Sequence, residues 1–208
     1  MAGQYAVFVE GIEGLKEFDS LRDDIKLWAA QAINKTADRG RAQAAREIRD
    51  QVNFPAQYLS PAGKRLYVSK QAQRNDLEGR IRARTRVTSL ARFVSGTTQI
   101  NKAGVRVEVA PGRARFLKRA FLVRLRAGSA DLDTRNNLGL AVRLKPGEKL
   151  RNKSEVRKLD SGLYLLYGPS VDQIFRARDG GGVAEDIAPD LADYMEQEFL
   201  RLVDLRRG

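Results

Sequence analysis

The segment from Leu15 to Asp50 constrains the fold of this chain most, because its apolar and small residues recur at steps of three and four. Such spacing places them on one face of an α-helix. The residues in this pattern are Leu15, Phe18, Leu21, Ile25, Trp28, Ala29, Ala32, Ile33, Ala37, Ala44, Ala45 and Ile48. We therefore expect one long helix over 15–50, on the order of 50 Å in length, with a bend or close packing at Gly40. A small domain cannot cover such a helix alone, so we expect it to pack against another molecule as well.

The segment 64–169 has the short alternating pattern of β-strands. Its clearest strand runs from Leu77 to Val87. The pattern predicts further strands at Val105–Val109, Ala120–Leu125, Leu138–Leu144 and Leu163–Tyr167. These are enough for one antiparallel or mixed sheet. The stretches 128–137 and 145–160 are polar or charged, which predicts long basic loops.

The segment 170–208 returns to a helical pattern. Ser170 and Gln173 have the spacing of a capping box, so a short helix should run from Val171 to about Ala177. A second helix should follow Gly180, because apolar residues recur there at helical spacing. The order of helix, strands and helix predicts an α+β fold, with the long N-terminal helix and the C-terminal helix packed on the sheet. We expect a single domain over 1–208.

The sequence contains no His and no Cys. These residues supply the commonest general base, the thiol nucleophile and most zinc ligands. Walker, dinucleotide-binding and hydrolase nucleophile patterns are absent as well. We therefore expect no enzyme activity, no cofactor and no metal. The run Gly180–Gly182 lacks the Lys and Ser/Thr of a phosphate loop, and a flexible hinge is the better interpretation.

The sequence also lacks the features of a membrane or secreted protein. No apolar run approaches the roughly 20 residues of a membrane span. The first residues, Met1 to Tyr5, lack the basic and apolar regions of a secretory signal. We therefore expect no membrane contact, and synthesis and folding in the cytoplasm.

The net charge of +12 is unevenly distributed along the chain. It is −1 over 1–59, +14 over 60–126, +3 over 127–169 and −4 over 170–208. The middle segment is therefore expected to contact phosphate groups or an acidic protein surface, with a strength that falls as salt rises.

Four arginines alternate within the clearest predicted strand, namely Arg80, Arg82, Arg84 and Arg86. Strand periodicity would put them on one face at intervals of roughly 7 Å. Four like charges repel one another, and no acidic residue is interleaved among them. We interpret them as a face that contacts a polyanion or a partner. A solvated face, or ion pairs with the acidic C-terminal helix, are the alternatives.

A second basic cluster, Arg113, Arg115, Lys118 and Arg119, leads into the strand at Ala120. Its mixed spacing suits a loop that contacts a polyanion, and a solubilising loop fits equally well. Aromatic residues are scarce around both clusters. Base-specific recognition of single strands is therefore not expected.

Two motifs are more distinctive. One is the strand, turn and helix start around Tyr167, Gly168, Pro169 and Ser170, and the other is the upstream strand with Phe116, Ala120 and Phe121. In these motifs the sequence resembles the minor tail protein Z family of phage tail completion proteins. The long N-terminal helix and the acidic C-terminal helix fit this resemblance. It implies that the motif residues define the fold and do not form a ligand site.

The resemblance implies a structural virion protein that completes the tail at the head–tail junction. Such a protein would be made in the host cytoplasm and reside at the head-proximal end of the tail. Its implied partners are further copies of itself in a ring, of six subunits in many relatives, and tail terminator, tail tube or neck and connector proteins. The arginine face would contact channel DNA or an acidic neighbour. The alternative from the charge pattern is a nucleic-acid-binding protein without sequence specificity.

Overall fold

The computed structural model describes most of the chain. The described residues are 7–8, 23–96, 99–128, 132, 137–145, 147–148, 156–160, 162–177 and 180–207. The chain divides into two compact units, which we call the helical unit and the sheet unit. The helical unit comprises Met1–Glu47, Leu59–Arg84 and Asp172–Gly208, and the sheet unit comprises Ile48–Tyr58 and Thr85–Val171. The expected single domain over 1–208 stays a prediction.

The long helix α1 covers Asp23–Gln51. It confirms the predicted helix over 23–50 and ends one residue later, while 15–22 lie outside the described residues. At 1.5 Å per residue this part of the helix is about 44 Å long. Small side chains form part of its buried face, namely Ala29, Ala30, Ala32, Ala37 and Ala44.

The helical unit contains a three-stranded antiparallel sheet in the order β1-β3-β2. Its strands are β1 (Val7–Phe8), β2 (Leu66–Lys70) and β3 (Arg80–Ala83). The expected strand Leu77–Val87 is therefore wrong in length. The backbone leaves the ladder after Ala83, because the carbonyl of Arg84 accepts a hydrogen bond from the N–H of Asp172 and not from a neighbouring strand.

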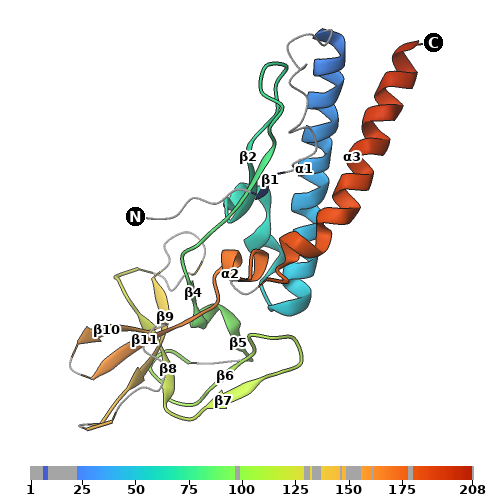
Figure 1. The fold of residues 1–208 in the computed structure, drawn as a ribbon. Helices are drawn as coiled ribbons and strands as arrows, with labels where there is room; N and C mark the ends of the chain where they lie inside the picture. Colours follow the sequence, from blue (N-terminus) through green and yellow to red (C-terminus); the bar gives the residue numbers. More distant parts are fainter. Residues whose placement is uncertain are drawn as a thin grey trace. The chain divides into compact units, whose positions relative to one another are not determined.

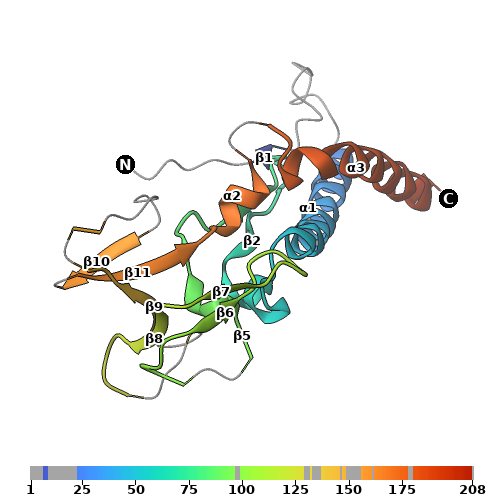
Figure 2. The same ribbon diagram turned by 90° about the horizontal axis from the view of Figure 1, so that it is seen from below.

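Two glycines allow α1 to pack closely on its neighbours. A Cβ atom at Gly79 would lie 2.8 Å from Cγ2 of Ile33, and one at Gly40 would lie 2.6 Å from Cδ1 of Leu191. Helix α1 lies between the β2–β3 hairpin and helix α3 (Val183–Arg207), as Figures 1 and 2 show. Of the two interpretations left open for Gly40, close packing is the one that the structure supports.

The predicted C-terminal helices are α2 (Val171–Phe175) and α3. Between them, Gly181 donates its backbone N–H to the Glu185 carboxylate at 2.8 Å. Gly182 is buried, and a Cβ atom there would lie 2.5 Å from the backbone nitrogen of Ala177. Glycine is therefore needed at position 182 because the backbone of Ala177 leaves no room for a side chain, and not because the segment has to act as a flexible hinge.

The sheet unit contains two antiparallel sheets. The larger has the order β10-β11-β9-β8, with β4 also paired to β11, and the smaller has the order β5-β6-β7. The strands of the larger sheet are β4 (Thr88–Ser89), β8 (Ala120–Arg124), β9 (Leu138–Arg143), β10 (Val156–Asp160) and β11 (Leu163–Gly168). Those of the smaller sheet are β5 (Val94–Ser95), β6 (Val105–Val107) and β7 (Arg115–Leu117). The described residues also form the short 3-10 helices η2 (Ala56–Leu59), η3 (Pro61–Gly63) and η4 (Leu90–Phe93), of which η3 belongs to the helical unit.

The α+β class is confirmed, but the strands of the described residues form three sheets where the sequence predicted one. Strands β6, β8, β9 and β11 match four predicted strands to within one or two residues. The expected loop over 145–160 is wrong in its last part, because β10 occupies Val156–Asp160. Most of the expected loop over 128–137 lies outside the described residues.

The motif around Gly168 forms the predicted strand, turn and helix start, since β11 ends at Gly168 and α2 begins at Val171. Gly168 is buried and pairs with Thr88 of β4. A Cβ atom at this position would lie 3.1 Å from the Phe93 ring and 3.2 Å from Leu90. The absence of a side chain thus allows η4 to pack directly on the end of β11.

Glu198 of α3 is a buried carboxylate that forms an ion-pair cluster with two exposed cations, one of them on α1. Its carboxylate lies 2.5 Å from Nζ of Lys35 on α1 and 2.6 Å from the guanidinium of Arg201. The hydrogen bonds from Arg201 and Lys35 lower the pKa of Glu198 to about 2. The cluster therefore links the two long helices while this carboxylate carries its charge.

We expect the Glu198 cluster to contribute stability that depends on pH. Because the folded-state pKa lies below the ordinary value of 4.5, the contribution is present above about pH 4.5 and is lost as the pH falls toward 2. Glu198→Gln should therefore melt below wild type at pH 7 and change less than wild type between pH 5 and 2. Glu196→Gln, at an exposed position of the same helix, is the matched control. Identical melting of Glu198→Gln and wild type at pH 7 would contradict this expectation.

Candidate polyanion-contact surface

The net charge of the chain belongs to one of its two units. The sheet unit carries 19 Lys and Arg against 7 Asp and Glu, a net charge of +12, whereas the helical unit carries 19 of each and is neutral. The strongly basic segment 60–126 is divided between them at Arg84. Contacts with a polyanion are therefore expected on the sheet unit.

The four alternating arginines do not form one continuous strand face. Arg80 and Arg82 lie on β3, but Arg84 and Arg86 follow the strand, and Arg86 already belongs to the sheet unit. Arg86 is exposed and the other three are half-buried. The predicted ladder of four guanidinium groups is therefore wrong, because the strand that would align them ends at Ala83.

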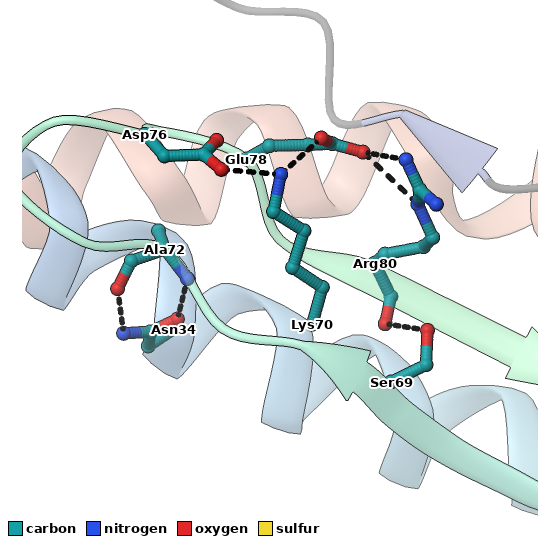
Figure 3. A network of polar contacts seen from close by, with 7 residues as sticks. All are labelled: Asn34, Ser69, Lys70, Ala72, Asp76, Glu78 and Arg80. Carbon is teal, nitrogen blue, oxygen red and sulfur yellow. Dashed lines mark hydrogen bonds and ion pairs between the residues drawn. The ribbon is translucent and has the colours of Figure 1, made fainter.

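Arg80 belongs to a polar network at the tip of the β2–β3 hairpin (Figure 3). Its guanidinium binds the Glu78 carboxylate with two hydrogen bonds, of 3.0 and 2.5 Å. Lys70 bridges Asp76 and Glu78 at 2.6 and 2.5 Å. Hydrogen bonds from Lys70 and then Arg80 lower the pKa of Glu78, and those to Asp76 and Glu78 raise the pKa of Lys70. An acidic residue therefore does compensate Arg80, contrary to the sequence interpretation.

The same hairpin tip is attached to α1 through Asn34 (Figure 3). The Asn34 side chain donates to the carbonyl of Ala72 at 3.0 Å and accepts from the N–H of Ala72 at 2.7 Å. Both polar groups of one backbone residue are thus satisfied by one side chain. We interpret these contacts as interactions that hold the hairpin tip in place on α1, and not as a ligand site.

The second basic cluster is spread over a strand and the two turns beside it, not over one loop. Arg115 lies on β7, Arg113 precedes this strand, and Lys118 and Arg119 lie in the turn before β8. All four side chains are exposed. Among the described residues, the side chains of Arg113, Arg115 and Lys118 have no hydrogen bond or ion pair.

Arg119 differs from the other members of this cluster, because it is paired. Its guanidinium binds both carboxylate oxygens of Glu148, at 2.6 and 2.9 Å, and the carbonyl of Arg143 at 2.7 Å. Arg119, followed by the backbone N–H of Lys145, lowers the pKa of Glu148 to about 2. Arg119 thus attaches the β7–β8 turn to the segment after β9 and contributes little free positive charge.

The motif residues fall into two groups by burial. Ala120, Gly168 and Ser170 are buried, and Phe121, Tyr167 and Pro169 are half-buried. Phe116 is 60% exposed on β7. Its ring lies beside Gly104, whose φ is +95°, with Cζ 3.0 Å from the position of a Cβ atom there.

Arg106 is a basic residue of this surface that the sequence interpretation did not single out. It is exposed on β6 directly opposite Phe116, while Val105 and Val107 on either side of it are buried. The alternation of Val, Arg and Val in β6 could have indicated it, because successive side chains of a strand point to opposite faces of the sheet. If the two Val side chains are buried, the Arg between them is exposed.

Within the described ranges, no group of three or more acidic side chains is arranged to hold a metal ion. None of the helices in the described part of the chain is long and apolar enough to cross a membrane. No family model, no curated protein and no solved structure matches the chain.

Proposed function

We propose that this chain is a structural protein of a phage particle, which completes the tail at the head–tail junction. It would do so as a homo-oligomeric ring in contact with tail terminator, tail tube, neck or connector proteins. The observation that carries the proposal is the division of net charge, which is +12 on the sheet unit and zero on the helical unit. A surface with this net positive charge attracts anionic partners.

Two further features support an assembly protein over an enzyme. Exposed Phe116 lies opposite exposed Arg106 on a sheet, and aromatic residues beside Arg are typical of protein interfaces. The resemblance in the motifs around Phe116 and Gly168 is to tail completion proteins, which have no catalytic residues to carry over.

The alternative is a nucleic-acid-binding protein without sequence specificity. The same charge favours it, because Lys and Arg contacts to phosphates supply most of non-specific affinity. Under this alternative the protein would act as a monomer on duplex DNA.

Titration of a labelled duplex at about 50 and 200 mM salt separates the two proposals. For an assembly protein we expect little binding by the purified protein at either salt concentration. A non-specific binder should instead reach a Kd of about 10⁻⁴ to 10⁻⁶ M at the higher salt and bind far more tightly at the lower. Arg113→Glu with Arg115→Glu removes two exposed cations of the sheet unit, and Arg46→Glu, exposed on α1, is the control on the neutral unit. Tight binding by a monomer, lost in the double variant and kept in the control, would favour the nucleic-acid-binding protein.

A further inference from the structure

The exposed face of the β5–β6–β7 sheet combines an apolar group with several cations. Ser95, Arg106 and Phe116 form one cross-strand row on this sheet. Arg113 and Lys118 flank β7 and have no side-chain partner among the described residues. Arg115 pairs with buried Val107 and therefore lies on the opposite face of the sheet. We call Arg106, Arg113, Phe116 and Lys118 the Phe116 surface.

The composition of the Phe116 surface limits what can bind there. Its partner must offer negative charges around an apolar group that can contact the Phe116 ring. Single-stranded nucleic acid usually binds where several aromatic side chains stack on successive bases. Only one large aromatic side chain is exposed among the described residues, so a protein surface fits better.

One face of α3 offers the complementary groups. Asp186, Asp190, Asp193, Leu200 and Asp204 are exposed. Their spacing places them within about 40° of one line along the helix, at 100° per residue. Leu200 is 52% exposed and lies between Asp193 and Asp204 on this line. Within the described residues, the only hydrogen bond or ion pair of these four carboxylates is a long hydrogen bond of 3.4 Å from the Gln43 side chain to Asp190.

We propose that the Phe116 surface of one molecule docks on this acidic face of α3 in a second copy of the chain. Phe116 would lie against Leu200, and the cations would lie opposite the Asp carboxylates. The lengths are compatible, since Asp186 to Asp204 spans about 27 Å of helix and Arg113 to Lys118 about 17 Å of extended chain. Opposite charges then select the register of the contact and raise the association rate.

Each copy carries both surfaces, so the contact is head to tail. Such heterologous interfaces repeat from one copy to the next and form rings when the rotation closes. The inference therefore rests on the proposed function and deepens it, because it names the two surfaces that would join neighbouring copies of the ring.

Charge reversal on either surface tests the inference. The hairpin variant carries Arg106→Glu and Lys118→Glu, and the helix variant carries Asp193→Lys and Asp204→Lys. We expect wild type to have a mass in light scattering that is a multiple of the 23.2 kDa of one chain. Each variant alone should associate on the order of 100-fold more weakly, because like charges then face each other. Their equimolar mixture should regain the wild-type mass, since both kinds of contact between the two variants again pair opposite charges.

Controls keep this test informative. Arg46→Glu should keep the wild-type mass, and melting curves should show that every variant folds. If a reversed variant unfolds, Phe116→Ser replaces it, and we expect at least about tenfold weaker association from the loss of the apolar contact. A monomeric wild type, unchanged masses of the variants, or no recovery in the mixture would each overturn the inference. If the inference fails while phage particles still contain the protein, the proposed function stands. If the mixture regains the wild-type mass but particles lack the protein, the contact stands and the proposed function fails.

Discussion

Gly182→Ala is expected to destabilise the protein by about 3 kcal/mol or more, which is a large part of the stability of a small protein. A Cβ atom there would lie 2.5 Å from the Ala177 nitrogen and 2.6 and 2.8 Å from the carbonyl carbon and Cα of Arg176. These are backbone atoms, so rotation of a side chain cannot relieve the clash. The turn between α2 and α3 would have to open, and the buried residues Val183 and Ile187 at the start of α3 would be displaced.

Gly181→Ala is the matched control for this prediction. Gly181 has a φ of +76°, and no atom lies within 4 Å of a Cβ built on it. Its replacement should cost only the roughly 1–2 kcal/mol of a left-handed residue with a side chain. Urea unfolding followed by circular dichroism measures both variants. A Gly182→Ala variant as stable as Gly181→Ala would contradict the packing that we describe and would restore the interpretation of a flexible hinge.

The helices could be predicted from the sequence because their signal is local. In α1 and α3 the buried positions recur at intervals of three and four residues, and most of them carry apolar side chains. Strands with one buried face, such as β6 and β8, were also predictable from alternation. By contrast, β10 exposes Arg157, Lys158 and Leu159 in succession, so it carries no alternation by which it could be predicted.

The candidate site was less predictable, for reasons of tertiary structure. The alternation of Arg in the sequence continues to Arg86, but β3 ends at Ala83. No residue near Ala83 in the sequence signals that the strand ends there. The pair of Arg80 with Glu78 could have been expected, because residues two apart share a strand face. The pair of Arg119 with Glu148 joins residues 29 positions apart, and only the folded chain brings them together.

Loss of the gene for this chain is expected to have the largest effect of all, because the proposed role is required for every particle. Without a completed tail end, heads and tails should not join, and infectious particles should be absent from the lysate. Supplying wild type from a plasmid should restore infectivity. Supplying the Arg113→Glu, Arg115→Glu variant should not restore it if contacts of the sheet unit are required. A deletion strain with a normal yield of infectious particles would show that the chain is dispensable for assembly.

The number of copies of this chain in each purified phage particle tests the proposed role most directly. Quantitative mass spectrometry of particles, with a major tail protein as the internal reference, measures this number. A ring at the head–tail junction predicts a small, constant copy number that persists after washing in high salt. Particles that lack the protein, or that carry a variable amount removed by salt, would contradict the assignment as a tail completion protein.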